Sequence, residues 1–311
     1  MKNILKKLTF KRSDLGEGIS YDGTEQTLTW VDIPNSKVFE YNKNANCKVF
    51  TLGAHSSFVA KTINNHYLSG GSEGLTLDGK FVSEAIKLEN DIINDGSVHP
   101  SGESLIFGSR DYYEFFEKGS LWILGKDITQ IKMKFKVFNG PAFSKDGSTV
   151  YFTDSPKRVI YKAKFNLSKE NFENITTFYQ FRQREDGFPD GMITDSRDNL
   201  WVAHWDGGKI SCINPKGKLI RSMSLPFTRP TSICFKGNDM YVTSARLNYN
   251  INDQYNGYTH VIKKIATSSP QVRLDDSFLK FFNFNHYFRL CIHMNILVHY
   301  GMIKKLSLIH I

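Results

Sequence analysis

A short apolar pattern that recurs along the chain constrains the fold more than any other feature of this sequence. Each strong copy is a hydrophobic–aromatic–hydrophobic triplet followed by small or polar residues, as in Val150-Tyr151-Phe152-Thr153-Asp154. The copies begin at Leu28, His66, Leu105, Val150, Leu200 and Met240, so they lie 38 to 50 residues apart, and the copy at His66 is the weakest. A repeat of this length indicates one supersecondary unit that is copied along the chain.

Turn signals beside the copies indicate that the unit is a group of short antiparallel strands. Asp146-Gly147 precedes the fourth copy, and Pro156-Lys157-Arg158 leads from it to a further strand, Val159–Ala163. Asp-Gly pairs between apolar runs are typical of tight hairpins, because these turns need positive φ angles. Several strands and turns within about 40 residues are typical of a propeller blade. Six copies therefore predict an all-β fold, a six-bladed β-propeller with four-stranded antiparallel blades.

The repeat divides the chain into two parts of unequal character. Residues 1–265 are predicted to form the propeller, whereas residues 266–311 lack the rhythm of turns and strands. This tail is rich in Phe, His, Ile and Leu, and its apolar stretch Cys291–Leu297 is too short to cross a bilayer. It is either a helical or membrane-touching appendage or a non-native C-terminus. We expect the second, so residues 266–311 are predicted to lie outside the native fold.

Composition and charge limit the classes of protein that this chain can belong to. Of the 311 residues 40% are hydrophobic and 23% are charged, which excludes wholesale disorder. The net charge of +9 raises nucleic acid or an anionic membrane as a partner. However, the tail holds five basic and two acidic side chains, and the remaining excess is spread along the blades. We therefore expect no nucleic-acid and no membrane partner, and a monomer or weak dimer.

The cysteines and the first residues bear on the compartment. The four cysteines lie far apart and form no CxxC pair, so we interpret them as free thiols in a reducing compartment. The basic opening, residues 1–7, is not followed by an apolar run and is not interpreted as a signal peptide. The expected location is the cytoplasm.

Polar residues stand beside glycines at the start of four blades. The segments are Leu15-Gly16-Glu17-Gly18, Asn94-Asp95-Gly96, Asn139-Gly140-Pro141 and Pro189-Asp190-Gly191. The first strand of a blade lines the central channel, and glycine lets the backbone approach the axis closely. Their carboxylate and amide side chains are therefore expected to converge at one mouth of the channel. Such oxygen ligands suit a divalent cation such as Ca²⁺, Mg²⁺, Mn²⁺ or Zn²⁺.

At these segments the sequence resembles the regucalcin and gluconolactonase group of sugar-lactone hydrolases. The resemblance covers about residues 14–265 and is carried by four stretches in order. They are Leu15–Tyr41, Asn94–Gly102, Asn139–Tyr161 and Pro189–Ile210. Each motif alone is weak, but four motifs in phase with a six-fold repeat are highly specific.

The resemblance implies a metal-dependent hydrolase that opens aldonolactones, such as gluconolactone or a pentonolactone, to aldonic acids. One divalent metal ion, with Ca²⁺ or Zn²⁺ expected before Mn²⁺ or Mg²⁺, would be held by Glu17, Asn139 and Asp190. Asn94 and Asp95 would contact the substrate. The cation would polarise the lactone carbonyl or lower the pKa of a bound water, and Asp190 would also act as the general base. No GxSxG elbow is present, so a serine nucleophile is not supported.

One departure from the family pattern concerns the substrate. Several members of the group carry an arginine two residues before the asparagine of NDG, where this chain has Ile92. An isoleucine cannot grip sugar hydroxyls, so a lactonase or esterase for less polar lactones remains an alternative. A second alternative is a calcium-binding, regucalcin-like regulatory propeller without turnover, because the same ligand set would serve it.

Overall fold

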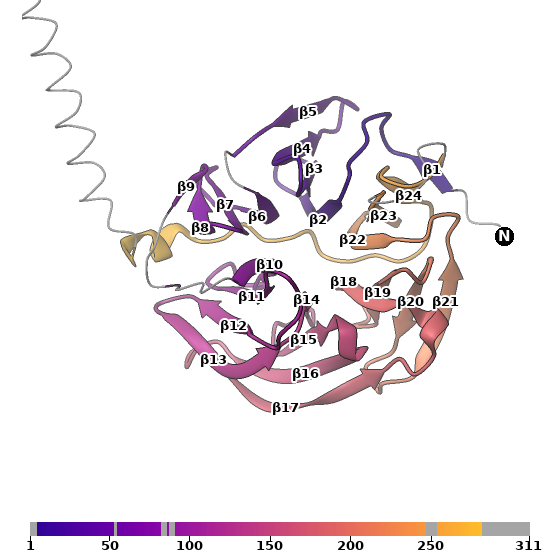
Figure 1. Ribbon diagram of the computed structural model, residues 1–311. Coiled ribbons are helices and arrows are strands. Elements are labelled where there is room, and N and C mark those ends of the chain that lie inside the picture. Colours follow the sequence, from indigo (N-terminus) through magenta and orange to yellow (C-terminus); the bar gives the residue numbers. More distant parts are fainter. Residues whose placement is uncertain (1–4, 53–54, 82–85, 87–90, 247–253, 282–311) are drawn as a thin grey trace, which may run out of the picture.

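The computed structural model describes residues 5–52, 55–81, 86, 91–246 and 254–281. Six four-stranded antiparallel sheets stand around a central channel, which confirms the predicted six-bladed β-propeller (Figure 1). Within each of the first five sheets the strands lie in sequence order from the channel outwards. No helix in the described ranges is long and apolar enough to cross a membrane.

The first three blades follow one another along the chain. The first contains β2 (Gly16–Asp22), β3 (Thr27–Asp32), β4 (Lys37–Tyr41) and β5 (Cys47–Phe50). The second contains β6 (Ser56–Lys61), β7 (Tyr67–Gly71), β8 (Gly74–Leu77) and β9 (Lys80–Phe81). The third contains β10 (Asp91–Val98), β11 (Leu105–Asp111), β12 (Gly119–Leu124) and β13 (Ile128–Phe135).

The last three blades complete the ring. The fourth contains β14 (Phe138–Phe143), β15 (Thr149–Asp154), β16 (Val159–Asn166) and β17 (Asn171–Gln180), with the short 3-10 helix η1 (Ser155–Lys157). The fifth contains β18 (Phe188–Thr194), β19 (Leu200–Trp205), β20 (Lys209–Ile213) and β21 (Leu219–Ser224), preceded by η2 (Arg184–Asp186). The sixth contains β22 (Pro230–Lys236), β23 (Asp239–Ser244), β24 (His260–Ile262) and, from the other end of the chain, β1 (Leu5–Lys7).

The sixth blade joins the two ends of the propeller sequence. Strand β1 pairs antiparallel with β24, and Leu5 lies opposite Ile262. Residues Leu5–Lys7 are thus the outermost strand of this blade. Backbone hydrogen bonds between the first and last parts of the propeller close the ring.

The repeated triplets form the packing between blades, as their period predicts. Trp30, Phe107, Phe152, Trp201 and Tyr241 all lie at second strands and are at most 8% exposed. The ring of Trp30 stacks on Phe39 at 5.1 Å, and that of Phe107 stacks on Trp122 at 5.4 Å. In the part of the chain that the structure describes, six hydrophobic clusters lie between and within the blades. Burial of these aromatic side chains, together with that of the aliphatic residues around them, stabilises the blades.

The start of the predicted tail lies across the propeller. We call residues 266–281, which include the 3-10 helix η3 (Asp276–Phe281), the strap; the yellow segment in Figure 1 crosses the ring from the sixth blade towards the second. Its side chains Leu274 and Phe278 are 1% and 2% exposed, within the hydrophobic cluster of the second and third blades. The structure therefore extends the packed chain beyond residue 265. Residues 282–311, the rest of the predicted tail, lie outside the described residues.

Candidate functional site

Irregularities in the inner strands create the site. Each of the six inner strands has a register shift against its neighbour, and four of these shifts fall at the predicted motifs. In β2 the shift lies between Glu17 and Ser20, and in β14 it lies between Asn139 and Ala142. Such bulges re-aim side chains out of the regular alternation of a strand. Gly18 and Gly140 occupy the bulges with φ angles of 57° and 81°, which a residue with a side chain rarely adopts.

The structure brings the two predicted acidic ligands into electrostatic contact. Burial, followed by the charges of Asp190 and Asp95, raises the pKa of Glu17 well above its ordinary value. Burial, followed by the charge of Asp95, raises the pKa of Asp190 in the same way. Asp190 is 4% exposed, whereas Glu17 is half-buried beside the channel. Carboxylates that repel one another in a poorly solvated site gain most from a cation between them.

Asp95 supports the backbone around these ligands. Its carboxylate accepts hydrogen bonds from the N–H groups of Gly96 at 2.8 Å and Gly140 at 2.7 Å. Burial raises the pKa of Asp95 to about 6, although these two hydrogen bonds act in the opposite direction. Asp95 therefore ties the third blade to the fourth beside Asn139. Contact of Asp95 with a substrate stays a prediction.

The two asparagines lie side by side. The amide nitrogen of Asn94 donates to Oδ1 of Asn139 at 2.8 Å and to the carbonyl of Phe138 at 2.8 Å. The amide nitrogen of Asn139 donates to Oγ of Ser155 at 2.9 Å. Both hydrogens of the Asn94 amide are thus used within the protein, and its oxygen accepts a hydrogen bond from Nε of Arg110 at 2.9 Å. Its predicted role in substrate binding is not tested by these contacts.

The donor set fits a divalent cation with a mixed carboxylate and amide shell. Among the described residues no three His, Cys, Asp or Glu side chains gather closely enough to hold a metal ion. Two carboxylates, Glu17 and Asp190, must therefore be completed by a neutral oxygen, and the Asn139 amide lies in the same ring of inner strands. Oxygen-only sets of this kind suit Ca²⁺ and Mg²⁺ best, and Mn²⁺ also accepts them.

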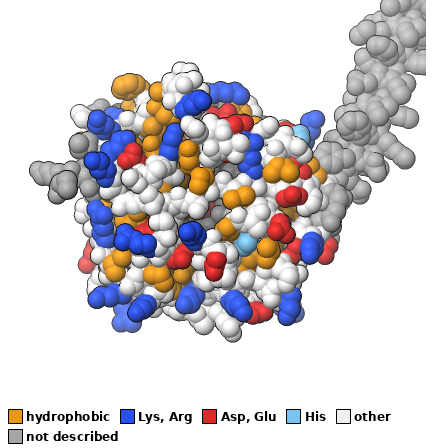
Figure 2. Space-filling model, turned by 180° about the vertical axis from the view of Figure 1, so that it is seen from behind, with side chains coloured by type: hydrophobic (Ala, Val, Ile, Leu, Met, Phe, Trp, Pro, Cys, Tyr) orange, Lys and Arg blue, Asp and Glu red, His pale blue; other side chains and the backbone are white. Residues whose placement is uncertain are grey.

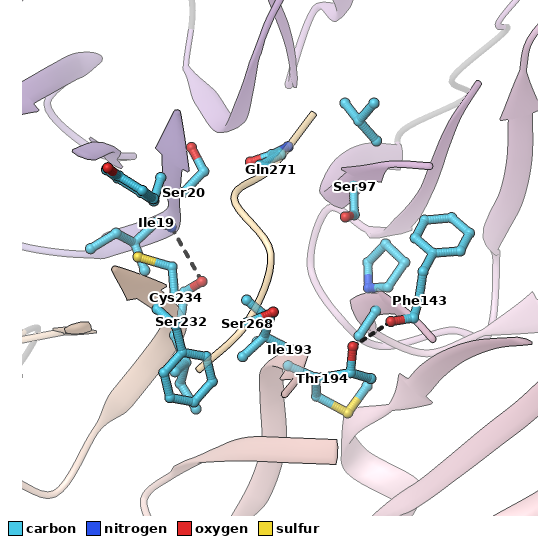
Figure 3. A pocket seen from close by; sticks show the side chains of 18 of the residues that line it. Ile19, Ser20, Ser97, Phe143, Ile193, Thr194, Ser232, Cys234, Ser268 and Gln271 are labelled. Atoms are coloured by element: carbon cyan, nitrogen blue, oxygen red, sulfur yellow. Dashed lines mark hydrogen bonds between the residues drawn. The ribbon is translucent and has the colours of Figure 1, made fainter. Parts of the chain in front are cut away.

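A cavity of about 290 Å³ lies along the channel behind this site. It is lined by site residues such as Gly18, Asp95 and Gly140 and also by residues 268–272 of the strap. Figure 3 shows Ser268 and Gln271 on the strap, between the inner strands that carry Ile19 and Phe143. The strap thus borders the same space as the site.

The second and sixth blades contribute hydroxyl groups at the equivalent bulges. Ser57 donates to the carbonyls of Ile93 at 2.7 Å and Gly70 at 2.8 Å. Thr231 donates to the carbonyl of Gly16. These hydroxyls connect neighbouring inner strands, so four blades supply the polar site residues and two supply ties between blades.

Comparison with known proteins agrees with this arrangement. Residues 15–246 match the model of the SMP-30/Gluconolactonase/LRE-like region. The chain belongs to this family. Regucalcin of Xenopus laevis is 30% identical over 250 residues, which cover 74% of this chain and 83% of that protein. An uncharacterized protein of Sulfolobus acidocaldarius is 35% identical over 244 residues, which cover 74% and 88%.

Solved structures of other family members show the same fold. A calcium-binding protein, regucalcin, from Agrobacterium tumefaciens aligns with a TM-score of 0.80 at 22% identity, over 88% of this chain and 97% of that one. A gluconolactonase from Xanthomonas campestris aligns with a TM-score of 0.68 at 18% identity, over 84% and 89%. The resemblance seen in the sequence motifs is thereby confirmed at the level of family and fold.

Arg110, which the sequence motifs did not predict, also lies beside the site. Ile92 lies opposite Arg110 in the pairing of β10 with β11, and the Nε of Arg110 donates to the amide oxygen of Asn94 at 2.9 Å. An arginine therefore reaches the site from the neighbouring strand. In the sequence Arg110 is marked only by its position, because it is a charged residue that directly follows the buried run Leu105–Ser109.

His204, near the end of the second strand of the fifth blade, has a structural role in packing. Its side chain is fully buried against Phe181, with ring centroids 4.5 Å apart, and its Nδ1 lies 2.8 Å from the carbonyl of Asp186. Burial lowers its pKa to about 4, so the ring is neutral near pH 7. A neutral, enclosed ring of this kind packs the fifth blade.

Proposed function

We propose that the protein is a metal-dependent hydrolase that opens sugar lactones to aldonic acids. The observation that carries this proposal is the pair of mutually repelling carboxylates, Glu17 and Asp190, beside the Asn139 amide at bulges of the inner strands. Membership of the SMP-30/Gluconolactonase/LRE-like family supports the reaction class. Two carboxylates and one amide balance the charge of one divalent ion.

Each residue of the site has its own role in the proposed reaction. Glu17, Asn139 and Asp190 hold the cation, which when bound supplies a Lewis acid for the lactone carbonyl. Asp190 accepts the proton of the attacking water in concert with the attack, a role that a carboxylate within reach of that water can perform. Asp95 keeps the backbone at Gly140 in place. No step requires a nucleophilic side chain.

The substrate class follows from the polar groups at the site mouth. Arg110 places a guanidinium group beside Asn94 even though Ile92 stands at the preceding position. Guanidinium groups bind hydroxyl and carbonyl oxygens well. We therefore propose polar sugar lactones as the substrates, in preference to the less polar lactones that Ile92 alone would favour.

The test is a lactone panel assayed with the full-length chain. The protein is stripped with a chelator and then supplied with Ca²⁺, Zn²⁺, Mn²⁺ or Mg²⁺ in turn, and acid release is followed from gluconolactone, a pentonolactone and an unsubstituted aliphatic lactone. We expect turnover of a sugar lactone that depends on the added cation. Hydrolysis of the aliphatic lactone alone would favour the less polar class instead.

A second candidate is a calcium-binding regulatory propeller without turnover. It is favoured by the description of the Agrobacterium tumefaciens relative as a calcium-binding protein. The same three ligands serve both candidates. Calcium binding by calorimetry, combined with no hydrolysis of any lactone or ester in the panel, would decide for this one.

A further inference from the structure

A line of hydrogen bonds crosses three blades beside the site. Nε of Arg110 on β11 donates to Oδ1 of Asn94 at 2.9 Å, and Nδ2 of Asn94 on β10 donates to Oδ1 of Asn139 at 2.8 Å. Nδ2 of Asn139 on β14 donates to Oγ of Ser155 at 2.9 Å. Oγ of Ser155 in η1 then donates to the carbonyl of Pro189, the residue before Asp190, at 2.6 Å. We call these five groups the relay.

The chemistry of the two ends fixes the direction of every bond in the relay. A guanidinium group can only donate, and a backbone carbonyl can only accept. Arg110 therefore requires the oxygen of Asn94 to face it, which turns the nitrogen of Asn94 towards Asn139. Asn139 must then present its oxygen to Asn94 and its nitrogen to Ser155. The orientation of both amides thus follows from the network.

The guanidinium group is itself held in place. Its Nη1 donates to the carbonyls of Asp111 at 3.2 Å and Tyr112 at 3.0 Å, and it forms an ion pair with Glu114 at 3.3 Å. The Arg110 side chain is 22% exposed, so these contacts are only partly screened by solvent. The loop after β11 therefore determines where the donor stands.

We propose that Arg110 is a positioning residue that, through Asn94, keeps the oxygen of Asn139 turned away from Ser155 and available to the cation. This inference rests on the proposed function, because it takes Asn139 to be a metal ligand. The carbonyl of Phe138, which also accepts from Asn94, favours the same orientation, so Arg110 and Phe138 act together. Partners that orient a metal ligand from behind typically contribute 10–100-fold to metal affinity.

If Arg110 acted only through its charge, its removal would change the metal affinity in the opposite direction, so the test distinguishes the two roles. A cationic side chain near a cation site repels the metal ion, so its removal would tighten metal binding if Arg110 acted by charge alone. If Arg110 acts by positioning, its removal weakens metal binding. A neutral replacement of similar length separates these two cases.

The experiment compares Mn²⁺ binding by calorimetry in full-length, chelator-stripped wild type and variants. We expect Arg110→Met to raise the Kd for Mn²⁺ by about 10–100-fold and Arg110→Lys, which keeps a donor, to recover part of the loss. Arg246→Met is the matched control, because it removes an arginine that pairs with Asp14 on the sixth blade, and it should leave the Kd unchanged. Arg110→Gln serves as the second neutral variant if thermal unfolding shows that Arg110→Met is not folded.

The outcomes distinguish this inference from the proposed function. Wild type that binds Mn²⁺, together with neutral Arg110 variants that bind it equally or more tightly, would overturn the positioning role and leave the proposed function intact. A rise in KM with unchanged metal affinity would also overturn it, because Arg110 would then act on the substrate alone and not on the metal ligand. Wild type that binds no divalent cation would overturn both.

Discussion

The two ends of the propeller channel are built in different ways. The front mouth, where the inner strands begin, carries Glu17, Asn139 and Asp190 on three separate blades. The rear mouth, where the inner strands end, is crossed by the strap. The front is a ring of short local motifs, whereas the rear depends on a segment that returns from the far end of the chain.

Backbone hydrogen bonds hold the strap to blades on opposite sides of the ring. The N–H of Ser196 in the fifth blade donates to the carbonyl of Thr267 at 2.6 Å, and the N–H of Gln271 donates to Tyr21 in the first blade at 2.9 Å. The N–H of Leu274 donates to Lys61 in the second blade at 3.0 Å. In the proposed function the charge at the front serves binding, whereas these contacts at the rear hold the strap to the ring. The candidate site and the strap, which stabilises the ring, thus lie at opposite ends of one channel.

Figure 2 shows how charged side chains are distributed on one face of the propeller. Lys and Arg side chains of the described residues are interspersed there with Asp and Glu around the rim. The charges that define the front mouth are instead two carboxylates, which the total of +9 conceals.

The largest expected effect breaks the front mouth alone. Asp190→Asn should lower kcat/KM for a sugar lactone by about 10²–10⁴-fold, because it removes a ligand charge and the base together. The metal-free variant should be at least as stable as metal-free wild type, since one of the three repelling carboxylates, Glu17, Asp95 and Asp190, is gone. Lactone hydrolysis and thermal unfolding in a chelator check both parts. Glu103→Gln, an exposed carboxylate, is the control and should change neither.

The next effect breaks the rear mouth alone. Leu274→Ala and Phe278→Ala should lower the free energy of unfolding by about 2–5 kcal/mol each, because they leave cavities in a packed cluster. Urea unfolding measures this loss, and kcat per folded molecule should stay the same. Val272→Ala, at a side chain 41% exposed, should stay within about 0.5 kcal/mol of wild type. Unchanged stability in both core variants would show that the strap does not belong to the native fold.

A pH series sharpens the contrast without any mutation. Burial raises the pKa of Asp95 to about 6, and that of Glu17 and Asp190 well above the ordinary range. At these three carboxyl groups the native state therefore binds more protons than the unfolded state, so the stability that they contribute to the metal-free protein should be lost as the pH rises from about 4 through 6 and beyond. Saturating divalent cation should reduce this slope. Chemical unfolding at several pH values, in the chelator and with saturating cation, is the measurement, and a pH dependence that the cation leaves unchanged would contradict the assignment.

The smallest effect concerns the rim of the rear mouth. Arg273 donates to the Asp22 carboxylate through Nε at 3.0 Å and to Oδ1 of Asn65 at 2.8 Å, and its side chain is 13% exposed. Arg273→Met should cost about 1–2 kcal/mol, because charge-assisted hydrogen bonds with little solvent contact are lost. Lys263→Met breaks a more exposed pair with Asp239 and should cost less than about 1 kcal/mol. Urea unfolding measures both variants. An equal decrease in the free energy of unfolding would mean that the ion pair of the strap stabilises the protein no more than the exposed pair does.

The front mouth could be predicted because its signals are local. Each motif joins one polar residue to a glycine, and the repeat places all of them at the starts of inner strands. The bulges at Glu17 and Asn139 were not predicted, because a register shift depends on pairing with the next strand. Arg110 was missed for the same reason, since its approach to Asn94 depends on the pairing of β10 with β11.

The strap could not be predicted because its partners are far away in the sequence. Residues 266–281 carry no strand rhythm, so the pattern that identified the blades set them apart. Leu274 is buried only because the second blade offers the Lys61 carbonyl and an apolar cluster at the right distance. Periodicity reports elements that repeat, and a single segment that crosses the ring has nothing to repeat.

Periodicity, turn signals and motifs in the sequence predicted the six blades and the family, both of which are confirmed, and they named the candidate residues of the site. Short-range periodicity and turn chemistry decide those features, because each blade is formed by residues close together in the chain. Only the tertiary structure decided which side chains meet. It joined β1 to β24, turned the Asn139 oxygen away from Ser155 through Arg110 and Asn94, and laid the strap over the rear mouth. These contacts link residues on different strands and blades, and their formation depends on closure of the ring.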